Sequence, residues 1–370
     1  MKTVRRLLYR DVVWSVVFVA VAFLSLFFFI DFLEELEGVG KHGYTVWHAG
    51  LAAMFELPGR FYELFPIAVL IGTIYAMARL AQSSEFTILR TGGLGPGRAL
   101  RLLLSLGVVM GVLTFLMGEY VAPLGEQQAV ALKARFRGGQ ALGRSGAWLK
   151  EHQGSGDNER SLSINVQGTT ADGQMRDIRI FEHDGNGVLL RRVQAATARS
   201  EKSEGQDVWR LQDVQVTEWP RGEQTQLQTR QYDSLDWPTT LQENVVAAAI
   251  SPIRSMSTID LWRYSRHLEL QEQTAQRYEL QFWRRAFYPL ACIVMVALAL
   301  PFAYLHARAG GISLKVFGGI MLGISFVLLN NVVGHLGLLR DWTPWIASAL
   351  PSLLYLLMSL AAFTWLVRYR

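Results

Sequence analysis

The sequence contains little cysteine and little charge. Among its 370 residues there is one cysteine, Cys292, which excludes a disulfide framework and a metal centre built from several cysteines. Charged residues make up 18% of the chain, below the roughly 25% that is usual for soluble globular domains, which argues against an ordinary cytosolic enzyme. Hydrophobic residues make up 51% and are concentrated in blocks, which excludes a disordered chain and indicates a membrane protein.

The motifs of common catalytic sites are also missing. The chain has no H-E-x-x-H, G-x-S-x-G or C-x-x-C pattern, the signatures of zinc proteases, serine hydrolases and thiol–disulfide enzymes. The glycine-rich run from Thr91 to Arg98 lacks the G-K-[ST] ending that holds nucleotide phosphates and Mg²⁺, so we expect a turn between helices there. The sequence predicts a non-enzymatic chain without catalytic residues, metal or cofactor; any ATP and Mg²⁺ would be bound by another chain.

What the sequence has instead is a set of long apolar blocks. A helix needs about 20 largely apolar residues to cross a membrane. Blocks of about this length cover residues 12–30, 61–77, 102–117, 286–305, 316–339 and 345–367. One such block could be a buried core helix, but six of them predict six transmembrane helices. Acidic residues rather than a signal cleavage site follow the first block, which we interpret as an uncleaved anchor.

Basic residues in the short loops predict the orientation of these helices. They are concentrated in the N-terminal arm, between the second and third blocks and at the C-terminus, for example Arg5, Arg6, Arg10, Arg79, Arg90, Arg98, Arg101 and Arg368. The loop after the first block is mainly acidic. Because loops rich in Lys and Arg remain in the cytoplasm, both termini are expected to be cytoplasmic. This distribution explains the net charge of +5 without a nucleic-acid partner.

A polar insert separates the third and fourth blocks. Apolar residues alternate in it with period two, and Asp184-Gly185-Asn186-Gly187 is a turn signal; the alternating residues include Leu162, Ile164, Val166, Ile178 and Ile180. This pattern predicts the antiparallel strands of a sandwich or jelly roll. The alternating residues either fill a closed core or line an open path for an acyl chain, and alternation alone does not decide between the two. The predicted orientation places this domain outside the inner membrane, which in a Gram-negative cell means the periplasm.

We therefore divide the chain into residues 1–134 with three membrane helices, a β-domain over 135–255, and 256–370 with linker helices and three further membrane helices. In the last part, Ser257 is expected to cap an amphipathic helix. A second helix is expected to begin near Glu272 and to continue into the fourth span. We expect both linker helices to lie along the membrane.

The short cytoplasmic segment around residues 83–92 has the features of a helix. A serine can cap its first turn, Glu85 suits the positive helix end, and Gly92-Gly93 can stop it. One interpretation is a helix lying on the lipid headgroups. The other is a coupling helix that docks into a cytoplasmic motor subunit, for which the candidates are Ser84, Glu85, Phe86, Ile88, Leu89 and Arg90.

Polar residues within the spans are costly and are therefore candidates for function. Asn330, Asn331 and His335 lie in the fifth span, and Glu119 lies at the end of the third. For the two asparagines, hydrogen bonding between helices competes with a ligand contact, whereas Glu119 is expected to anchor the end of its span. Cys292 is expected to be a small packing residue.

Several stretches resemble the LptF/LptG permeases of the lipopolysaccharide exporter. They are residues 80–85 (LAQSSE), 118–127 (GEYVAPLGEQ), 277–283 (RYELQFW) and 350–352 (LPS). Together with the arrangement of spans and insert, the resemblance covers nearly the whole chain, and the stretch 118–127 favours the LptG branch.

The resemblance implies six transmembrane helices with a periplasmic β-jelly roll inserted between the third and fourth. It also implies an LptF-like sister permease, an LptB-like ATPase dimer, an LptC-like single-span protein, and lipopolysaccharide and membrane lipids as ligands. Glu85 matches the acidic residue of the family's coupling helix and would dock against the ATPase. The first and fifth spans would form lateral gates of a cavity shared with the sister permease.

One departure concerns the charge at the outer end of the first span. Some family members have a basic residue there, suited to lipid A phosphates, whereas this chain has Asp31. Lys41 or Arg60 could substitute, or divalent cations could bridge carboxylates to phosphates. The remaining cavity candidates are Phe28, Phe32 and Asn331.

The functional expectation is an ATP-driven permease in the inner membrane that extracts lipopolysaccharide from the outer leaflet and passes it to a periplasmic bridge. The alternatives are an exporter of another lipid or of a lipoprotein, and a membrane scaffold of a periplasmic assembly that transports nothing. A scaffold would need neither a coupling helix nor a cavity.

Overall fold

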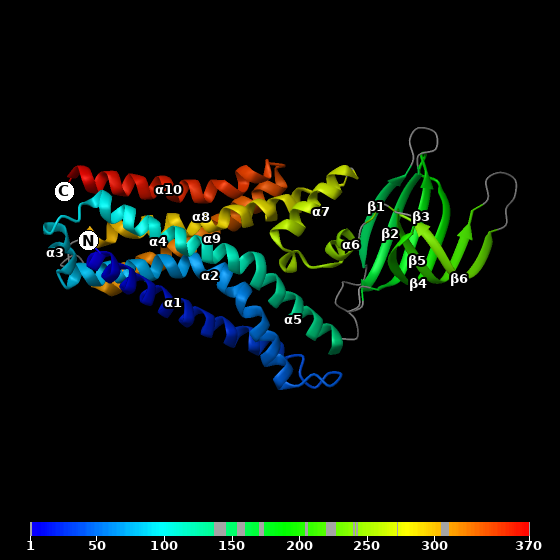
Figure 1. Cartoon of the computed structure of the whole chain (residues 1–370), viewed down its shortest axis with the longest axis horizontal. Coiled ribbons are helices and arrows are strands. Elements are labelled where there is room, and N and C mark those ends of the chain that lie inside the picture. Colours follow the sequence, from blue (N-terminus) through cyan, green and yellow to red (C-terminus); the bar gives the residue numbers. More distant parts are fainter. Residues whose placement is uncertain are drawn as a thin grey trace. The chain divides into compact units, whose positions relative to one another are not determined.

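The computed structural model describes residues 2–136, 146–153, 160–169, 174–203, 206–219, 227–239, 241, 243–271, 273–304 and 311–369. Its contacts divide the chain into two compact units. The first contains Met1–Gly40, Tyr44–Ala129 and Glu279–Arg370, and the second contains Lys41–Gly43 and Val130–Tyr278. The first unit is the helical bundle, and the second, called the β-domain below, is built around a sheet (Figure 1).

Within the described residues, six helices are long and apolar enough to cross a membrane, as predicted. Helices α1 (Lys2–Leu36) and α2 (Val46–Gln82) come first, and α3 (Glu85–Thr91) is short. Next, α4 (Pro96–Leu116) continues through the π-helix η1 (Met117–Val121) into α5 (Ala122–Phe136). The later spans are α8 (Gln276–Tyr304), α9 (Ile312–Leu339) and α10 (Pro344–Tyr369).

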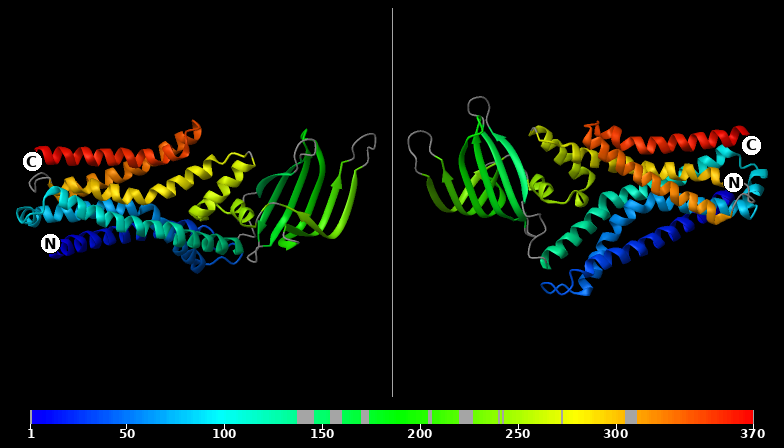
Figure 2. Two further views of the ribbon diagram at one scale, coloured as in Figure 1. Left: turned by 45° about the horizontal axis from the view of Figure 1, so that its top comes forward. Right: turned by 180° about the vertical axis from the view of Figure 1, so that it is seen from behind.

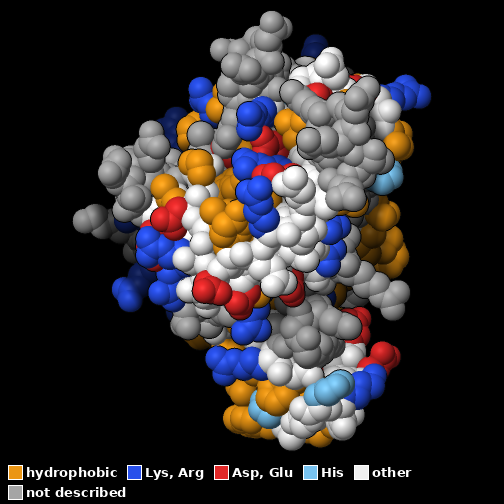
Figure 3. Space-filling view, turned by 90° about the vertical axis from the view of Figure 1, so that its right-hand side faces the viewer, with side chains coloured by type: hydrophobic (Ala, Val, Ile, Leu, Met, Phe, Trp, Pro, Cys, Tyr) orange, Lys and Arg blue, Asp and Glu red, His pale blue; other side chains and the backbone are white. Residues whose placement is uncertain are grey.

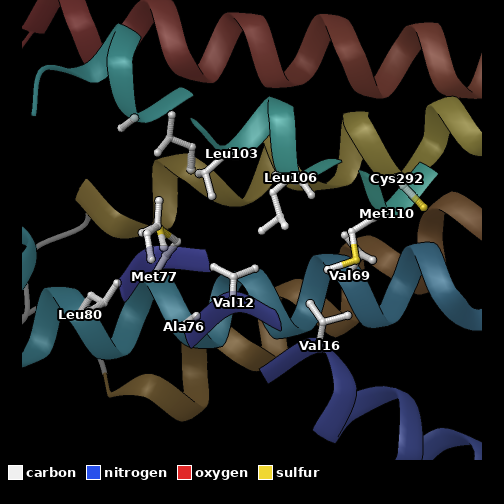
Figure 4. Packing of buried hydrophobic residues seen from close by; sticks show 14 of the residues in the cluster. Val12, Val16, Val69, Ala76, Met77, Leu80, Leu103, Leu106, Met110 and Cys292 are labelled. Carbon is white, nitrogen blue, oxygen red and sulfur yellow. The ribbon is translucent and has the colours of Figure 1, made fainter. Parts of the chain in front are cut away.

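The core of the bundle lies where α1, α2, α4 and α8 meet. One buried cluster contains Val12 and Val16 of α1, Val69 of α2, Leu106 of α4 and Cys292 of α8 (Figure 4). Thr114 and Cys292 lie 3.2 Å apart, hydroxyl oxygen to sulfur, which agrees with the packing role predicted for the cysteine. These contacts fix the first three spans against the fourth.

The amino end of α1, the short helix α3 and the carboxyl end of α10 lie at the same end of the bundle (Figures 1 and 2). An even number of spans returns the chain to the side on which it starts. The termini therefore share one side, and α3 lies on that side too.

The described strands of the β-domain form one antiparallel sheet with the order β1-β2-β3-β4-β5-β6. The strands are β1 (Ala147–Gln153), β2 (Arg160–Thr169), β3 (Met175–Asp184), β4 (Leu189–Ser203), β5 (Gln206–Glu218) and β6 (Gln228–Pro238). The inserted β-domain was predicted, but the described topology is a meander and not the two facing sheets of a jelly roll. Each strand pairs with the next one in the sequence. The alternation of apolar residues does not predict this pairing, because it reveals only which face of a strand is buried.

Local signals in this domain behave as the sequence predicts. The carboxylate of Asp184 accepts hydrogen bonds from the amides of Asn186 (3.0 Å) and Val188 (2.9 Å), which closes the turn between β3 and β4. The outer surface carries both signs of charge, since Lys and Arg lie beside Asp and Glu in Figure 3. Such a mixed surface is typical of a solvated domain.

Two helices, α6 (Glu243–Ile250) and α7 (Thr258–Leu270), and the 3-10 turn η3 (Ile253–Ser255) follow the sheet. Ser257 caps α7 as predicted: its hydroxyl accepts from the amide of Asp260 at 3.1 Å, and the Asp260 carboxylate accepts from the amide of Ser257 at 3.2 Å. The next helix begins at Gln276 and not near Glu272, which lies outside the described residues.

Candidate functional site

The short helix α3 is fixed to the bundle by its aromatic and basic side chains. Phe86 is 3% exposed and meets the ring of Tyr304, at the end of α8, edge to face with 5.0 Å between centroids. The guanidinium carbon of Arg90 lies 5.2 Å from the centroid of the same ring. Leu89 packs against the buried cluster. Because a helix of seven residues is too short to be stable alone, these contacts hold α3 in place.

The other face of α3 is exposed. Ile88 is 66% exposed, and Glu85 is also exposed, in the first turn of the helix. A carboxylate in this position is favoured by the helix dipole. The predicted coupling residues are thus divided: Phe86 and Leu89 face the bundle, whereas Glu85 and Ile88 are available to another protein.

The serine cap expected at the start of α3 is not formed. Ser84 occupies the N-cap position with φ of 62°, in the left-handed region, and makes no side-chain capping bond. The Ser83 hydroxyl instead donates to the carbonyl of Leu80, at 3.3 Å. A capping serine needs an extended backbone, so the conformation of Ser84 explains the missing cap. The predicted stop is present, since α3 ends at Thr91 and Gly93 has φ of 98°.

Near the carboxyl end of α1, Asp31 forms a buried ion pair with Arg60 of α2. Nε and Nη2 of Arg60 donate to the two carboxylate oxygens of Asp31 at 3.0 and 2.6 Å. The Asp31 side chain is 1% exposed and that of Arg60 is 25% exposed. The guanidinium also lies 5.4 Å from the ring centroid of Phe27. Arg60 is therefore neutralised by Asp31, and the pair joins α1 to α2.

The other cavity candidates take no part in the ion pair between Asp31 and Arg60 within the described residues. The rings of Phe28 and Phe32 stack at 6.2 Å on the same helix as Asp31. Asn331 is exposed on α9, and Lys41 is exposed in the loop that groups with the β-domain. Asp31 and Arg60 form the contact, and among the described residues neither Lys41 nor Asn331 takes part in it.

We expect loss of either member of this pair to weaken the bundle. Replacing Asp31 with Ala would leave a mostly buried guanidinium without its carboxylate, which costs about 3–5 kcal/mol in comparable buried pairs. Arg60→Lys should also destabilise the protein, because lysine does not reproduce the two parallel bonds.

A double-mutant cycle on thermal stability in detergent provides the measurement. The double variant Asp31→Asn/Arg60→Gln should lose less stability than the single variants Asp31→Asn and Arg60→Gln combined. Additive losses would contradict a direct interaction. Glu37→Gln, at an exposed position just beyond α1, is the control for removal of one negative charge.

The inward row of the β-domain is closed in this structure. Ile164, Ile180, Val193 and Val216 pair across four adjacent strands and are at most 6% exposed. The predicted lipid-path candidates Leu162, Ile164, Val166, Ile178 and Ile180 are all 0–1% exposed. Their burial fits the closed-core interpretation for this state of the domain.

Alternation did not reveal that the same inward face contains a buried carboxylate. Glu182 is 2% exposed and accepts from Nη1 of Arg160 at 2.5 Å and from Nε of Arg191. Arg191 also lies over the ring of Trp237, 4.7 Å from its centroid. Two guanidinium groups compensate the buried charge. The sequence gives no local signal for this pair, because it depends on the strand register, which places Arg191 opposite Glu182.

The stretch 118–127 mediates close packing between α2 and the third span. A Cβ on Gly118 would lie 2.3 Å from Cε2 of Tyr62, and one on Gly125 would lie 2.3 Å from the carbonyl oxygen of Phe55. Glu119 lies in the π-helix η1 and is 7% exposed, so it is buried within the bundle, not merely placed at an interface. The two glycines, seven residues apart, were the signal in the sequence.

Comparison with known proteins identifies the family. The family model for the lipopolysaccharide export system permease LptF/LptG matches residues 6–366. The chain belongs to the LptF/LptG family. It is 29% identical over 339 residues to lipopolysaccharide export system permease protein LptG of Escherichia coli (strain K12), covering 91% of each chain. It is 26% identical over 358 residues to LptG of Haemophilus influenzae, covering 96% of each.

These LptG relatives and the six spans make the chain an LptG-type, multi-pass protein of the inner membrane. The predicted membership in the LptF/LptG family, including the LptG branch, is confirmed. LptF/LptG membership also indicates a transmembrane subunit of the lipopolysaccharide transport system and not an enzyme.

Proposed function

We propose that this chain is one permease subunit of an ATP-driven exporter that extracts lipopolysaccharide from the outer leaflet of the inner membrane and passes it to a periplasmic bridge. Family membership supports the substrate. On this proposal both termini and α3 are cytoplasmic, and the β-domain is periplasmic. The proposed partners are an LptF-like permease, an LptB-like ATPase dimer, which would bind ATP and Mg²⁺, and an LptC-like single-span protein.

The observation that carries the proposal is the two-sided character of α3. Its exposed side presents Glu85 and Ile88, and its buried side is joined through Phe86 to Tyr304 at the end of a membrane span. A force applied by an ATPase to the exposed side would therefore reach α8 through a packed contact. A helix resting on headgroups would also present Ile88 on its exposed side, but it would not require a buried anchor on a span.

The outward faces of α1 and α9 support a shared cavity. Large apolar side chains on these faces are exposed, among them Phe18 (75%) and Phe29 (57%) on α1 and Phe317 (56%) and Leu328 (59%) on α9. A sister permease and lipid would cover them. Moving acyl chains into water costs about 0.8 kcal/mol for each methylene, so an apolar route is required from the bilayer onward.

The buried ion pair limits how lipid A phosphates would be bound. Arg60 already has a carboxylate partner in Asp31, so a phosphate would have to displace that carboxylate or be bound by Lys41. The closed row of the β-domain would likewise have to separate before acyl chains could pass between its strands.

Replacing Glu85 with Lys tests the proposal. The reversed charge should abolish copurification of the ATPase, or reduce by at least about tenfold the ATP-dependent release of lipopolysaccharide from proteoliposomes to a soluble acceptor. Glu37→Lys makes the same charge change at an exposed position just beyond the carboxyl end of α1. This control should leave both ATPase copurification and lipopolysaccharide release unchanged. Unaltered association and release in Glu85→Lys would favour a scaffold, and release of another lipid in place of lipopolysaccharide would favour the alternative exporter.

A further inference from the structure

A pocket of about 580 Å³ lies along the first three turns of α1, and its lining includes none of the coupling-helix or cavity candidates. Its lining residues follow one face of the helix at helical spacing: Arg5, Arg6, Tyr9, Arg10, Val13 and Trp14. Tyr9 holds this part of α1 against α4, because its hydroxyl donates to the carbonyl of Leu102 at 3.2 Å and lies 2.5 Å from the hydroxyl of Ser105. One wall of the pocket is thereby fixed in the bundle.

The polar part of the pocket has an excess of positive charge. Asp11 lies beside it, but its closer partner is Arg79 at 2.9 Å, whereas Nε of Arg10 is 3.7 Å from the same carboxylate. Arg5 and Arg6 are exposed, and within the described part of the chain no ion pair joins either of them to a carboxylate. Guanidinium groups in this situation are suited to bind a phosphate.

The other part of the pocket is apolar. Val13 and Trp14 are 36% and 69% exposed, and they belong to the uncharged block that begins at Val12 and forms the first span. The pocket therefore crosses from the charged arm to the membrane-embedded helix within about three turns. A soluble anion would use only the first part, and an apolar molecule only the second.

We propose that this pocket binds an anionic phospholipid of the leaflet that surrounds the amino end of α1. Arg5, Arg6 and Arg10 contact the phosphate, and Val13 and Trp14 contact the first part of the acyl chains. Basic groups directly beside a span attract anionic headgroups in this way, and tryptophan favours the same depth. Under the predicted orientation this is the cytoplasmic leaflet. The site does not depend on the proposed export function.

The test is to measure phosphatidylglycerol binding to the purified chain by native mass spectrometry. Arg5→Gln/Arg6→Gln should weaken binding about 30-fold, which corresponds to about 1 kcal/mol for each arginine. Arg176→Gln/Arg179→Gln removes the same charge from exposed positions on β3 and should bind as the wild type does. Arg5→Lys/Arg6→Lys should retain most of the binding, which would show that a folding defect is not responsible.

Three results would overturn the proposal. One is equal binding of phosphatidylglycerol to the wild type and to the glutamine variant. Another is equally tight binding of zwitterionic phosphatidylcholine, or of soluble glycerophosphoglycerol, which would remove the need for a charged lipid. The third is a photo-crosslinker at Trp14 that captures a protein subunit and no phospholipid, because a protein would then occupy the pocket.

Discussion

Replacing Phe86 with Ala should release α3 from the bundle and reduce ATP-dependent transport by at least about tenfold. Phe86 is 3% exposed and contacts Tyr304 edge to face, and truncating a buried phenylalanine typically costs about 3–5 kcal/mol. A helix of seven residues has little stability of its own to set against that loss. A disordered α3 would no longer transmit motion to α8.

Hydrogen exchange separates loss of the helix from loss of a partner. In the wild type, the amide of Ile88 donates to the carbonyl of Ser84 at 3.1 Å and that of Leu94 to the carbonyl of Leu89 at 3.0 Å. Both amides should exchange faster in Phe86→Ala. They should be unchanged in Ile88→Ala, which removes an exposed side chain and should impair ATPase association without loosening α3.

Phe115→Ala is the matched control, because Phe115 on α4 is 43% exposed. It should preserve α3 and transport. If the amides of α3 remain protected in Phe86→Ala, the aromatic contact does not hold the helix, and the proposed route to α8 loses its support.

The sequence predicts the number of spans because hydropathy reports which residues are buried in hydrocarbon. It predicts their ends poorly. The second apolar block begins at Phe61, whereas α2 begins at Val46. The residues between them include Glu56 and Arg60, which lower the hydropathy but leave the helical backbone hydrogen bonds intact. The helix therefore extends well beyond its apolar part.

The site is predictable only where its determinants are local. Glu85 at the helix start and the stop at Gly93 follow from neighbouring residues. That Phe86 faces inward while Ile88 faces outward depends on Tyr304, more than 200 residues away in the sequence. A short apolar run does not reveal which of its residues is covered by such a distant partner. The bond between Asp31 and Arg60 was hidden for the same reason, so the sequence suggests Arg60 as a phosphate ligand and does not reveal that Asp31 is its partner.

Gly72→Ala should be among the most destabilising small substitutions in the bundle. A Cβ at Gly72 would lie 2.6 Å from both the Cα and the amide nitrogen of Val16. These are backbone atoms of α1, so the clash is relieved only if the helix itself moves. That movement would disrupt the buried cluster to which Val12, Val16 and Val69 belong (Figure 4). Overpacking costs about 1–3 kcal/mol even where side chains can adjust, and here they cannot.

Gly59→Ala is the control, because Gly59 lies in the same helix and a Cβ there would have no atom within 4 Å. Alanine is favoured over glycine within a helix by about 1 kcal/mol, so this variant should be neutral or more stable. The thermal midpoint of the purified protein should therefore fall for Gly72→Ala and stay level or rise for Gly59→Ala. Shifts of the same sign and size would mean that α1 and α2 do not approach each other closely at Gly72. A fall confined to Gly72→Ala would show that the first span is held against the second through backbone contact, so that any gate movement of α1 must carry this part of α2 with it.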